Sequence, residues 1–187
     1  IFSSSEWRRL VLSAIATQDE FPSDKEDYKG ARVELLAYVV LSLWCGLRPE
    51  SELLLLNWED IHLKDKFVHI DDERTKTQLG RLVTIPDCAI PLLERCRKSE
   101  GPIVCPKNFR KRWKWLRDKA DVRLLWKPDI CRHTFASLHY AHYRGKEKLM
   151  SELGHTNPSM LRHYVNLGSE RPEEAREFFE FNLPAKT

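Results

Sequence analysis

No apolar stretch in this 187-residue sequence is long enough to cross a bilayer. A membrane-spanning helix needs about twenty consecutive, mostly apolar residues. The longest candidate, residues 33–47, is interrupted by Glu34, Ser42 and Gly46, so we interpret it as a buried helix of a globular protein. No signal-peptide pattern opens the chain. We therefore expect a cytoplasmic protein with no membrane partner.

The sequence also lacks the cysteine and histidine patterns of disulfide frameworks and metal centres. The cysteines are odd in number and contain no Cys-x-x-Cys pair: Cys45, Cys88, Cys96, Cys105 and Cys131. We expect them to be reduced residues of the core. His139 and His142 lie three residues apart without a matching set of cysteines or carboxylates. We therefore predict no metal site.

The formal net charge of +3 is too small to indicate a partner by itself. The charge is distributed unevenly, however. Residues 107–127 contain nine lysines and arginines against two aspartates, a local charge of +7. A basic segment in a nearly neutral protein is typical of a nucleic-acid-binding face.

Hydrophobic periodicity predicts a mostly helical domain with one small sheet. Apolar residues recur at helical spacing over residues 3–17, 31–45, 49–56, 89–98, 109–120, 128–138, 149–153, 158–165 and 172–181. Residues 61–85 instead have the pattern of two or three antiparallel strands, with Lys76 at or near a turn. The sequence shows no internal repeat, and 187 residues with 42% hydrophobic content can bury one core. We expect a single domain of the α+β class, mainly α with a small antiparallel sheet.

The helix at 128–138 carries an arginine that suits an anion-binding site. Its apolar stripe contains Cys131, Phe135 and Leu138, and Arg132 falls on the opposite side, where we expect it to face outward. A guanidinium on a rigid helix is planar, always charged and able to bond two phosphate oxygens at once. The alternative is that Arg132 pairs with an acidic neighbour.

Arg48 and Lys76 are further candidates for phosphate chemistry. Arg48 flanks the start of a short helix, where unpaired backbone N–H groups and the helix dipole favour an anion. The alternative role of Arg48 is an ion pair with Glu50 or Glu52. Lys76 is either an ordinary surface lysine or a mobile ammonium that protonates a leaving oxygen.

His155 and Tyr164 could complete such a site. His155 follows Gly154 at a predicted helix end, where it either donates a hydrogen bond to an oxyanion or merely caps the helix. Tyr164 is either a core aromatic or a nucleophile. A phenol with a pKa near ~10 attacks poorly at neutral pH, but two guanidinium groups beside it would favour the phenolate.

Five short motifs occur here in a characteristic order. They are Gly46-Leu-Arg48, Thr75-Lys76-Thr77, Arg132-His-Thr, Leu153-Gly-His155 and, nine residues further, Tyr164. In this order the sequence resembles the catalytic domain of the tyrosine recombinase (phage integrase) family. The most specific signals are Arg-His-Thr-Phe-Ala-Ser from residue 132 and Leu-Gly-His-Thr-Asn-Pro from residue 153. The resemblance extends over residues 3–168, which is nearly the whole chain.

The resemblance implies an active site made of Arg48, Lys76, Arg132, His155 and Tyr164. Tyr164 would attack a DNA phosphodiester to form a 3′-phosphotyrosyl bond, and Lys76 would protonate the departing 5′-hydroxyl. The two arginines and His155 would stabilise the five-coordinate phosphorus. Because the protein ester keeps the bond energy, no metal, ATP or other cofactor is expected. The implied partners are double-stranded DNA and further copies of the chain, as a tetramer on DNA associated with the nucleoid.

Two positions depart from the family pattern. Asp129 stands where the family usually has histidine or lysine, and we expect its side chain to cap the following helix. The alternative is a general base whose charge opposes that of the phosphate. The turn Arg48-Pro-Glu-Ser-Glu52 is one residue longer than the common version. The carboxylate that supports Arg48 is therefore either Glu52 or Glu50.

Other parts of the chain are expected to bind DNA or a second protomer. The side chains expected to contact the DNA backbone are Lys107, Arg110, Lys111, Lys114 and Arg117. The family usually has an additional N-terminal DNA-binding domain, so we expect residues 1–187 to be the C-terminal catalytic domain of a longer protein and to bind DNA weakly alone. We expect its tail helix, within residues 169–187, to contact a neighbouring protomer through exposed Phe178 and Phe179.

The same residues also suit two rival functions. One is a type IB topoisomerase-like enzyme that nicks and closes DNA without recombining it. The other is a catalytically impaired DNA-binding relic of a recombinase, a hypothesis motivated by Asp129. A covalent DNA adduct that depends on Tyr164 would exclude the relic.

Overall fold

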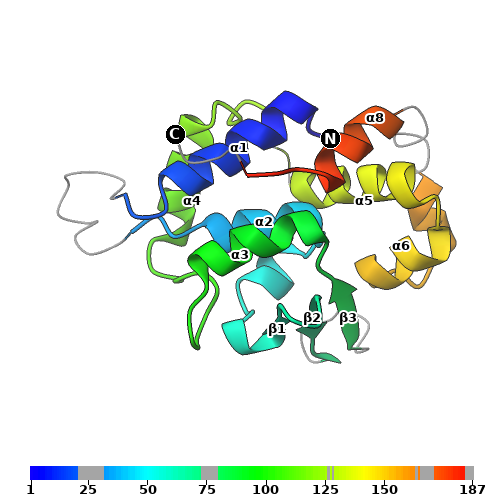
Figure 1. The fold of residues 1–187 in the computed structure, drawn as a ribbon, viewed down its shortest axis with the longest axis horizontal. Coiled ribbons are helices and arrows are strands. Elements are labelled where there is room, and N and C mark those ends of the chain that lie inside the picture. The colour runs from blue at the N-terminus through cyan, green and yellow to red at the C-terminus, as the bar shows by residue number, and fades with distance from the viewer. Residues whose placement is uncertain are drawn as a thin grey trace.

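Helix α2 (Leu36–Trp44) runs through the centre of the fold and is buried on every side (Figure 1). The computed structural model describes residues 1–20, 32–72, 80–125, 127, 129–162, 164 and 171–183. The other α-helices are α1 (Ser4–Ala16), α3 (Ile90–Cys96), α4 (Phe109–Lys119), α5 (Ile130–Tyr143), α6 (Lys146–Leu153) and α8 (Pro172–Phe179). Helices α1, α3 and α5 pack directly against α2, so that α2 forms the centre of the core.

α2 begins at Leu36 rather than at residue 31, where the sequence pattern predicted its start. Val33 and Glu34 are instead bound to the turn that follows α1: the Val33 N–H donates to Glu20 O, and the Glu34 N–H donates to Gln18 O. Glu34 also has a φ of 41°, which a continuing right-handed helix cannot accommodate. The central helix is therefore shorter than its apolar sequence suggested.

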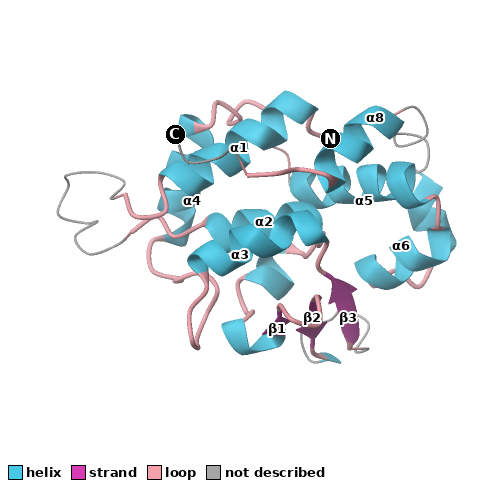
Figure 2. Cartoon of the chain, in the orientation of Figure 1, coloured by secondary structure: helices cyan, strands magenta, loops and turns pink. Residues whose placement is uncertain are grey.

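The small antiparallel sheet predicted within residues 61–85 is confirmed (Figure 2). Its strands are β1 (Ile61–His62), β2 (Phe67–Ile70) and β3 (Arg81–Thr84), in the order β1-β2-β3. Val68 lies opposite Ile61 on one side and Val83 on the other, and all three side chains are buried. Strands β1 and β3 are the two edges of the sheet, and β3 contacts α6. Lys76 lies outside the described residues.

Most helix predictions hold with changed boundaries: α5 and α6 are longer than predicted, and α1, α2, α3, α4 and α8 are shorter. The helix predicted at 89–98 is α3, preceded by a 3-10 turn, η5 (Asp87–Ala89). The segment predicted as a helix at 158–165 begins as a 3-10 helix, η6 (Pro158–Leu161). A further 3-10 turn, η3 (Trp58–Asp60), leads into β1. The observed class, mainly helical with one three-stranded sheet, is the predicted one.

An aromatic cluster holds α8 onto the rest of the molecule. Phe178 stacks on Trp44 at 5.1 Å between ring centroids and meets Trp7 edge-on at 5.2 Å. Phe181, just after the helix, packs against the same two tryptophans. Phe178 is fully buried and Phe179 half-buried, so the prediction that both are exposed for a neighbouring protomer is wrong. The apolar face of α8 is used within its own chain because α1, α2 and α5 converge there.

The cysteines follow the sequence prediction with one exception. Cys45, Cys96 and Cys131 are buried free thiols and Cys88 is half-buried, but Cys105 is exposed. Burial raises the pKa of the Cys131 thiol to about 12, so it stays protonated. Within the described ranges, no helix combines the length and the hydrophobicity that a bilayer crossing requires.

Candidate functional site

Arg132 is buried inside the molecule rather than displayed on its surface. Only 4% of its surface is exposed, because α5 is covered on nearly all sides and Arg132 points toward α2 and α6. Its Nη1 donates to Gly46 O at 2.5 Å and its Nη2 donates to Leu153 O at 2.6 Å. The prediction of an outward-facing side chain is therefore wrong. The guanidinium instead joins the end of α2 to the end of α6.

Two glycines make this junction possible. Gly46 has a φ of +59°, and a Cβ at this position would lie 2.3 Å from Cδ1 of Phe135. Because Gly46 has no side chain, its backbone can pack against Phe135, which lies one turn after Arg132 on α5, and its carbonyl can reach Arg132. Gly154 ends α6 with a φ of +62°, which turns the chain toward His155. The Gly-Leu-Arg and Leu-Gly-His motifs thus shape the backbone around the arginine.

Arg48 lies beside Arg132 and shares one of its acceptors. Its Nη2 reaches Leu153 O at 3.4 Å, while its Nη1 donates to Glu52 Oε1 at 2.6 Å. The backbone N–H of Arg48 also donates to Glu52, at 2.8 Å. The supporting carboxylate is therefore Glu52, whereas Glu50 is exposed. The ion pair foreseen as an alternative is present, and it holds the guanidinium at the site.

The longer turn after Arg48 is accommodated by a π-helix, η2 (Pro49–Leu53), where a short α-helix at 49–56 was predicted. A π-turn contains one residue more than an α-turn. The carboxylate of Glu52 is fully buried as a result. Burial alone would raise its pKa, but the hydrogen bond and charge of Arg81 together with Arg48 lower it below the usual value.

Arg81, which we did not predict from the sequence, is the third arginine of this cluster. It begins β3, its side chain is only 8% exposed, and its Nη2 donates to Glu52 Oε2 at 2.9 Å. Its Nε donates to Glu152 O at 3.0 Å, next to the carbonyl that Arg48 and Arg132 share. An arginine on a short strand gives no periodic signal of burial. Only the packing of β3 against α6 reveals its position.

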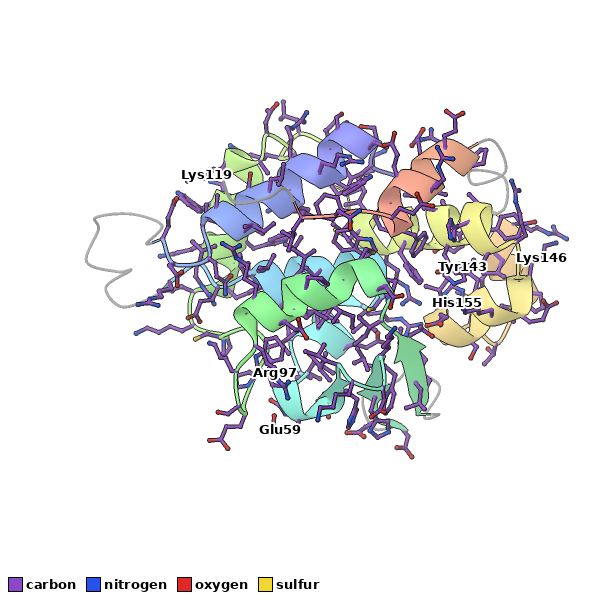
Figure 3. The ribbon with its side chains drawn as sticks, viewed as in Figure 1. Glu59, Arg97, Lys119, Tyr143, Lys146 and His155 are labelled. Atoms are coloured by element: carbon purple, nitrogen blue, oxygen red, sulfur yellow. The ribbon has the colours of Figure 1, made fainter. Side chains whose placement is uncertain are left out.

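His155 contacts Arg132 directly. Its Nε2 lies 3.2 Å from Nη2 of Arg132, and because a guanidinium can only donate, Nε2 is the acceptor and the ring proton is on Nδ1. Burial and the nearby charges of Arg132 and Arg48 lower the pKa of His155 to about 4. The imidazole is therefore neutral at pH 7. Figure 3 shows His155 beside the end of α6, below α5.

Tyr164 approaches this group from the other side. Its ring is inclined by 20° to the His155 ring, with centroids 6.3 Å apart. The hydroxyl lies 3.1 Å from Nδ1 of His133, the residue that follows Arg132 on α5. Burial raises the pKa of the phenol, and the charges of Arg132 and Arg48 only partly oppose this effect. The two arginines therefore do not produce a phenolate in the absence of DNA.

Asp129 does not cap α5 as predicted. It occupies the N-cap position with a left-handed backbone, at a φ of 58°, and its side chain makes no capping hydrogen bond. The left-handed backbone turns the carboxylate away from the first N–H groups of the helix, and the side chain is exposed. Its negative charge contributes to the raised pKa of Tyr164.

The basic segment forms an exposed face on α4. Arg110, Lys111 and Lys114 are exposed, as is Lys107 just before the helix. Arg117 is half-buried, with its guanidinium 5.6 Å from the centroid of the Trp113 ring. Arg112, on the other side of the helix, is 1% exposed and donates to Val33 O and Cys105 O. One of the nine basic residues therefore stabilises the fold and cannot contact DNA.

The site thus gathers the guanidinium groups of Arg48 and Arg132 at the carbonyl of Leu153, with the neutral imidazole of His155 against Arg132 and the phenol of Tyr164 beside His155. Such a group suits the binding of a tetrahedral anion next to a nucleophile, because the arginines supply paired donors and positive charge. Lys76, the fifth residue predicted for the site, lies outside the described residues. Among the described parts of the chain, no group of three or more His, Cys, Asp or Glu is arranged to hold a metal ion.

Three solved structures share this fold. The XerA recombinase has a TM-score of 0.66 and 18% identity, over 99% of this chain and 66% of that one. The XerH site-specific recombinase has a TM-score of 0.63 and 20% identity, over 96% and 53%. The catalytic domain of bacteriophage HP1 integrase has a TM-score of 0.59 and 22% identity, over 97% and 95%. At these identities the likeness concerns the fold alone.

Sequence comparison gives the family. A curated tyrosine recombinase of Thermosipho africanus (strain TCF52B) is 30% identical over 185 residues, which cover 89% of this chain. The chain spans only 62% of that relative's length. The model of the phage integrase family matches residues 17–171. Since this match covers most of the chain and includes every motif of the site, the chain belongs to the phage integrase family.

Proposed function

We propose that this chain is the catalytic part of a tyrosine site-specific recombinase, which cleaves and rejoins DNA strands through a 3′-phosphotyrosyl intermediate. The observation that supports the proposal most strongly is the convergence of Arg48 and Arg132 on Leu153 O, with His155 in contact with Arg132 and Tyr164 beside His155. These residues come from four separate segments of the chain. A shared acceptor for the buried Arg132 and the half-buried Arg48 places their positive charge at one point, where a phosphate can replace the carbonyl as a partner.

The chemistry follows from these groups. The Tyr164 oxygen attacks phosphorus, the bond from phosphorus to the 5′ oxygen breaks, and the phosphate stays on the tyrosine. Arg48 and Arg132 neutralise the charge that develops on the non-bridging oxygens, and His155 assists as a neutral hydrogen-bonding group. Lys76 gives a proton to the departing 5′ oxygen. A 5′-hydroxyl from another strand reverses these steps, which exchanges the strands without an external energy source.

The relatives support this reaction class. The XerH structure is described as a post-cleavage complex with a palindromic difH substrate, and the Thermosipho relative is named a tyrosine recombinase. The tetramer on DNA and the association with the nucleoid stay predictions. The burial of Phe178 removes one argument for a protomer contact through α8.

The first test is the covalent adduct. The full-length protein is incubated with a pool of nicked duplexes of random sequence, and protein-linked DNA is detected on a denaturing gel. We expect an adduct with the natural protein and none with Tyr164→Phe, because only the phenol oxygen can form the ester. Tyr140→Phe, on α5, should leave the adduct unchanged. An adduct that survives Tyr164→Phe, or no adduct at all with the natural protein, would contradict the proposal.

The basic face of α4 gives a second prediction. Arg110→Gln combined with Lys114→Gln removes two exposed charges one helical turn apart. If both contact phosphates, non-specific DNA affinity should fall, and the slope of log K against log salt should decrease in magnitude by about 2. The matched control is Arg95→Gln with Lys98→Gln, at the end of α3, which should leave the slope unchanged. Equal slopes for all three proteins would remove α4 from the DNA interface.

A further inference from the structure

We propose that His133 is the general base that accepts the proton of Tyr164 during DNA cleavage. The inference rests on the proposed recombinase function and assigns the proton transfer that this function requires. In the sequence, His133 is only the middle residue of the Arg132-His-Thr motif. The contact from Nδ1 of His133 to the Tyr164 hydroxyl, at 3.1 Å, is within hydrogen-bond distance.

The position of His133 is fixed by its helix. It follows Arg132 on α5, whose neighbouring side chains Cys131, Arg132 and Thr134 are all buried. Its backbone N–H donates to Asp129 O at 2.8 Å in the first turn. The imidazole and phenol rings are 5.5 Å apart between centroids with an angle of 36°. The same rigid helix therefore places the phosphate-binding guanidinium and the base on adjacent residues.

The other candidate bases are less suitable. His155 uses Nε2 to accept from Arg132, and burial together with the surrounding positive charge lowers the pKa of its imidazole, which makes it a weak base. Asp129 is exposed at the start of α5. A carboxylate beside the reaction centre would also repel the phosphate, whereas a neutral imidazole would not. His133 thus supplies the proton acceptor for the phenol. Asp129, which stands where the family usually has histidine or lysine, does not supply it.

The proton transfer balances with the cleavage step. Before the reaction, the phenol O–H donates to the unprotonated Nδ1, and the ring proton of His133 is on Nε2. As the phenol oxygen forms its bond to phosphorus, the O–H bond breaks and its proton moves to Nδ1, which leaves an imidazolium. The 5′ oxygen leaves with a proton from Lys76. On rejoining, the imidazolium returns its proton to the phenol oxygen.

The test compares His133→Asn and His133→Ala with the natural full-length protein in single-turnover adduct formation. Asparagine can still hydrogen-bond the phenol, but it cannot take up a proton. General base catalysis contributes about a hundredfold to ten-thousandfold, so we expect both variants to be slower by a hundredfold or more. His142→Asn makes the same change at an exposed position of α5 and should keep the natural rate. His133→Asn with a rate within threefold of the natural protein would show that His133 only holds the phenol, which overturns the proposal.

A substrate with sulfur at the leaving position distinguishes the role of His133 as the base from that of Lys76 as the acid. The duplex that is captured best from the random pool is synthesised again with sulfur in place of the bridging 5′ oxygen, because a thiolate leaves without being protonated. The sulfur should restore adduct formation by Lys76→Ala and leave the His133 variants slow. Restoration of His133→Ala by sulfur would overturn the base assignment. Failure of the recombinase function itself is distinguishable, because the natural protein would then form no adduct with either substrate.

Discussion

Arg132→Lys should reduce the rate of covalent adduct formation by about a hundredfold to a thousandfold, the loss that follows removal of a donor that stabilises a developing oxyanion. A guanidinium presents several donors in a fixed plane, whereas an ammonium is a single point charge on a flexible chain. Arg132 uses two of its nitrogens on Gly46 O and Leu153 O, and one of these also contacts His155. Lysine cannot make these contacts together, so the phosphate would meet an incomplete and displaced group.

The chain offers a matched control for this substitution. Arg9 also bonds two backbone carbonyls, with Nε on Ala120 O at 3.1 Å and Nη2 on Asp121 O at 3.0 Å, but it joins α1 to the end of α4. Arg9→Lys should therefore disturb a similar double contact without changing the adduct rate. Both variants are compared by single-turnover gel assay and by thermal melting. If Arg132→Lys cleaves at the natural rate, the phosphate-binding role of Arg132 is refuted.

Glu52→Gln should destabilise the folded protein by about 3–5 kcal/mol, the usual cost of removing one partner of a buried ion pair. For a domain of this size, such a change lowers the melting temperature by on the order of 10 °C. Glu52 is fully buried and accepts hydrogen bonds from both Arg48 and Arg81. The amide keeps the shape of the side chain but leaves two largely buried guanidinium groups without a counter-charge. The adduct rate should fall too, because Arg48 loses the group that orients it.

Glu50→Gln is the control, since Glu50 is on the same π-helix but exposed, and it should melt within a degree or two of the natural protein. The pH dependence gives a second check. In the folded state, the hydrogen bonds and charges of Arg81 and Arg48 hold the pKa of Glu52 below its ordinary value of 4.5. The stability from this carboxylate is therefore present above pH 4.5 and is lost as the pH falls below it. The difference between Glu52→Gln and the natural protein should narrow on acidification, and a constant difference would contradict the assigned ion pair.

The sequence predicted the local patterns of this protein well, because each is encoded in neighbouring residues. The amphipathic spacing of Trp7, Leu10 and Val11 predicted α1, and β-type residues within 61–85 predicted the sheet. The helix-ending glycines at 46 and 154 have the positive φ values that this role requires. The order of the motifs pointed to the phage integrase family, which the comparisons confirm.

Predictions failed where a side chain's environment depends on segments far away in the sequence. Arg132 was expected to face solvent because the stripe opposite Phe135 contains polar residues. α5 is instead enclosed by α2, α6 and α8, so both faces are buried. Phe178 was expected to be exposed on an isolated tail helix, yet Trp7 and Trp44 provide a pocket for it. Periodicity indicates which residues share a face of a helix, but it does not indicate how many neighbouring helices pack against that face.

What the sequence by itself determined here is most of the local structures, the family and five of the residues proposed for catalysis: Arg48, Lys76, Arg132, His155 and Tyr164. Only the tertiary structure decided which groups contact these residues. Glu52, and not Glu50, is the carboxylate that binds Arg48; Arg81 is a third guanidinium beside it; and His133 contacts the phenol of Tyr164. The physical reason is that hydrogen bonds within a turn or helix are specified by adjacent residues. The contacts that assemble this site join residues up to 105 positions apart, as Arg48 and Leu153 show, and those contacts form only when the core brings the ends of α2, α6 and β3 together.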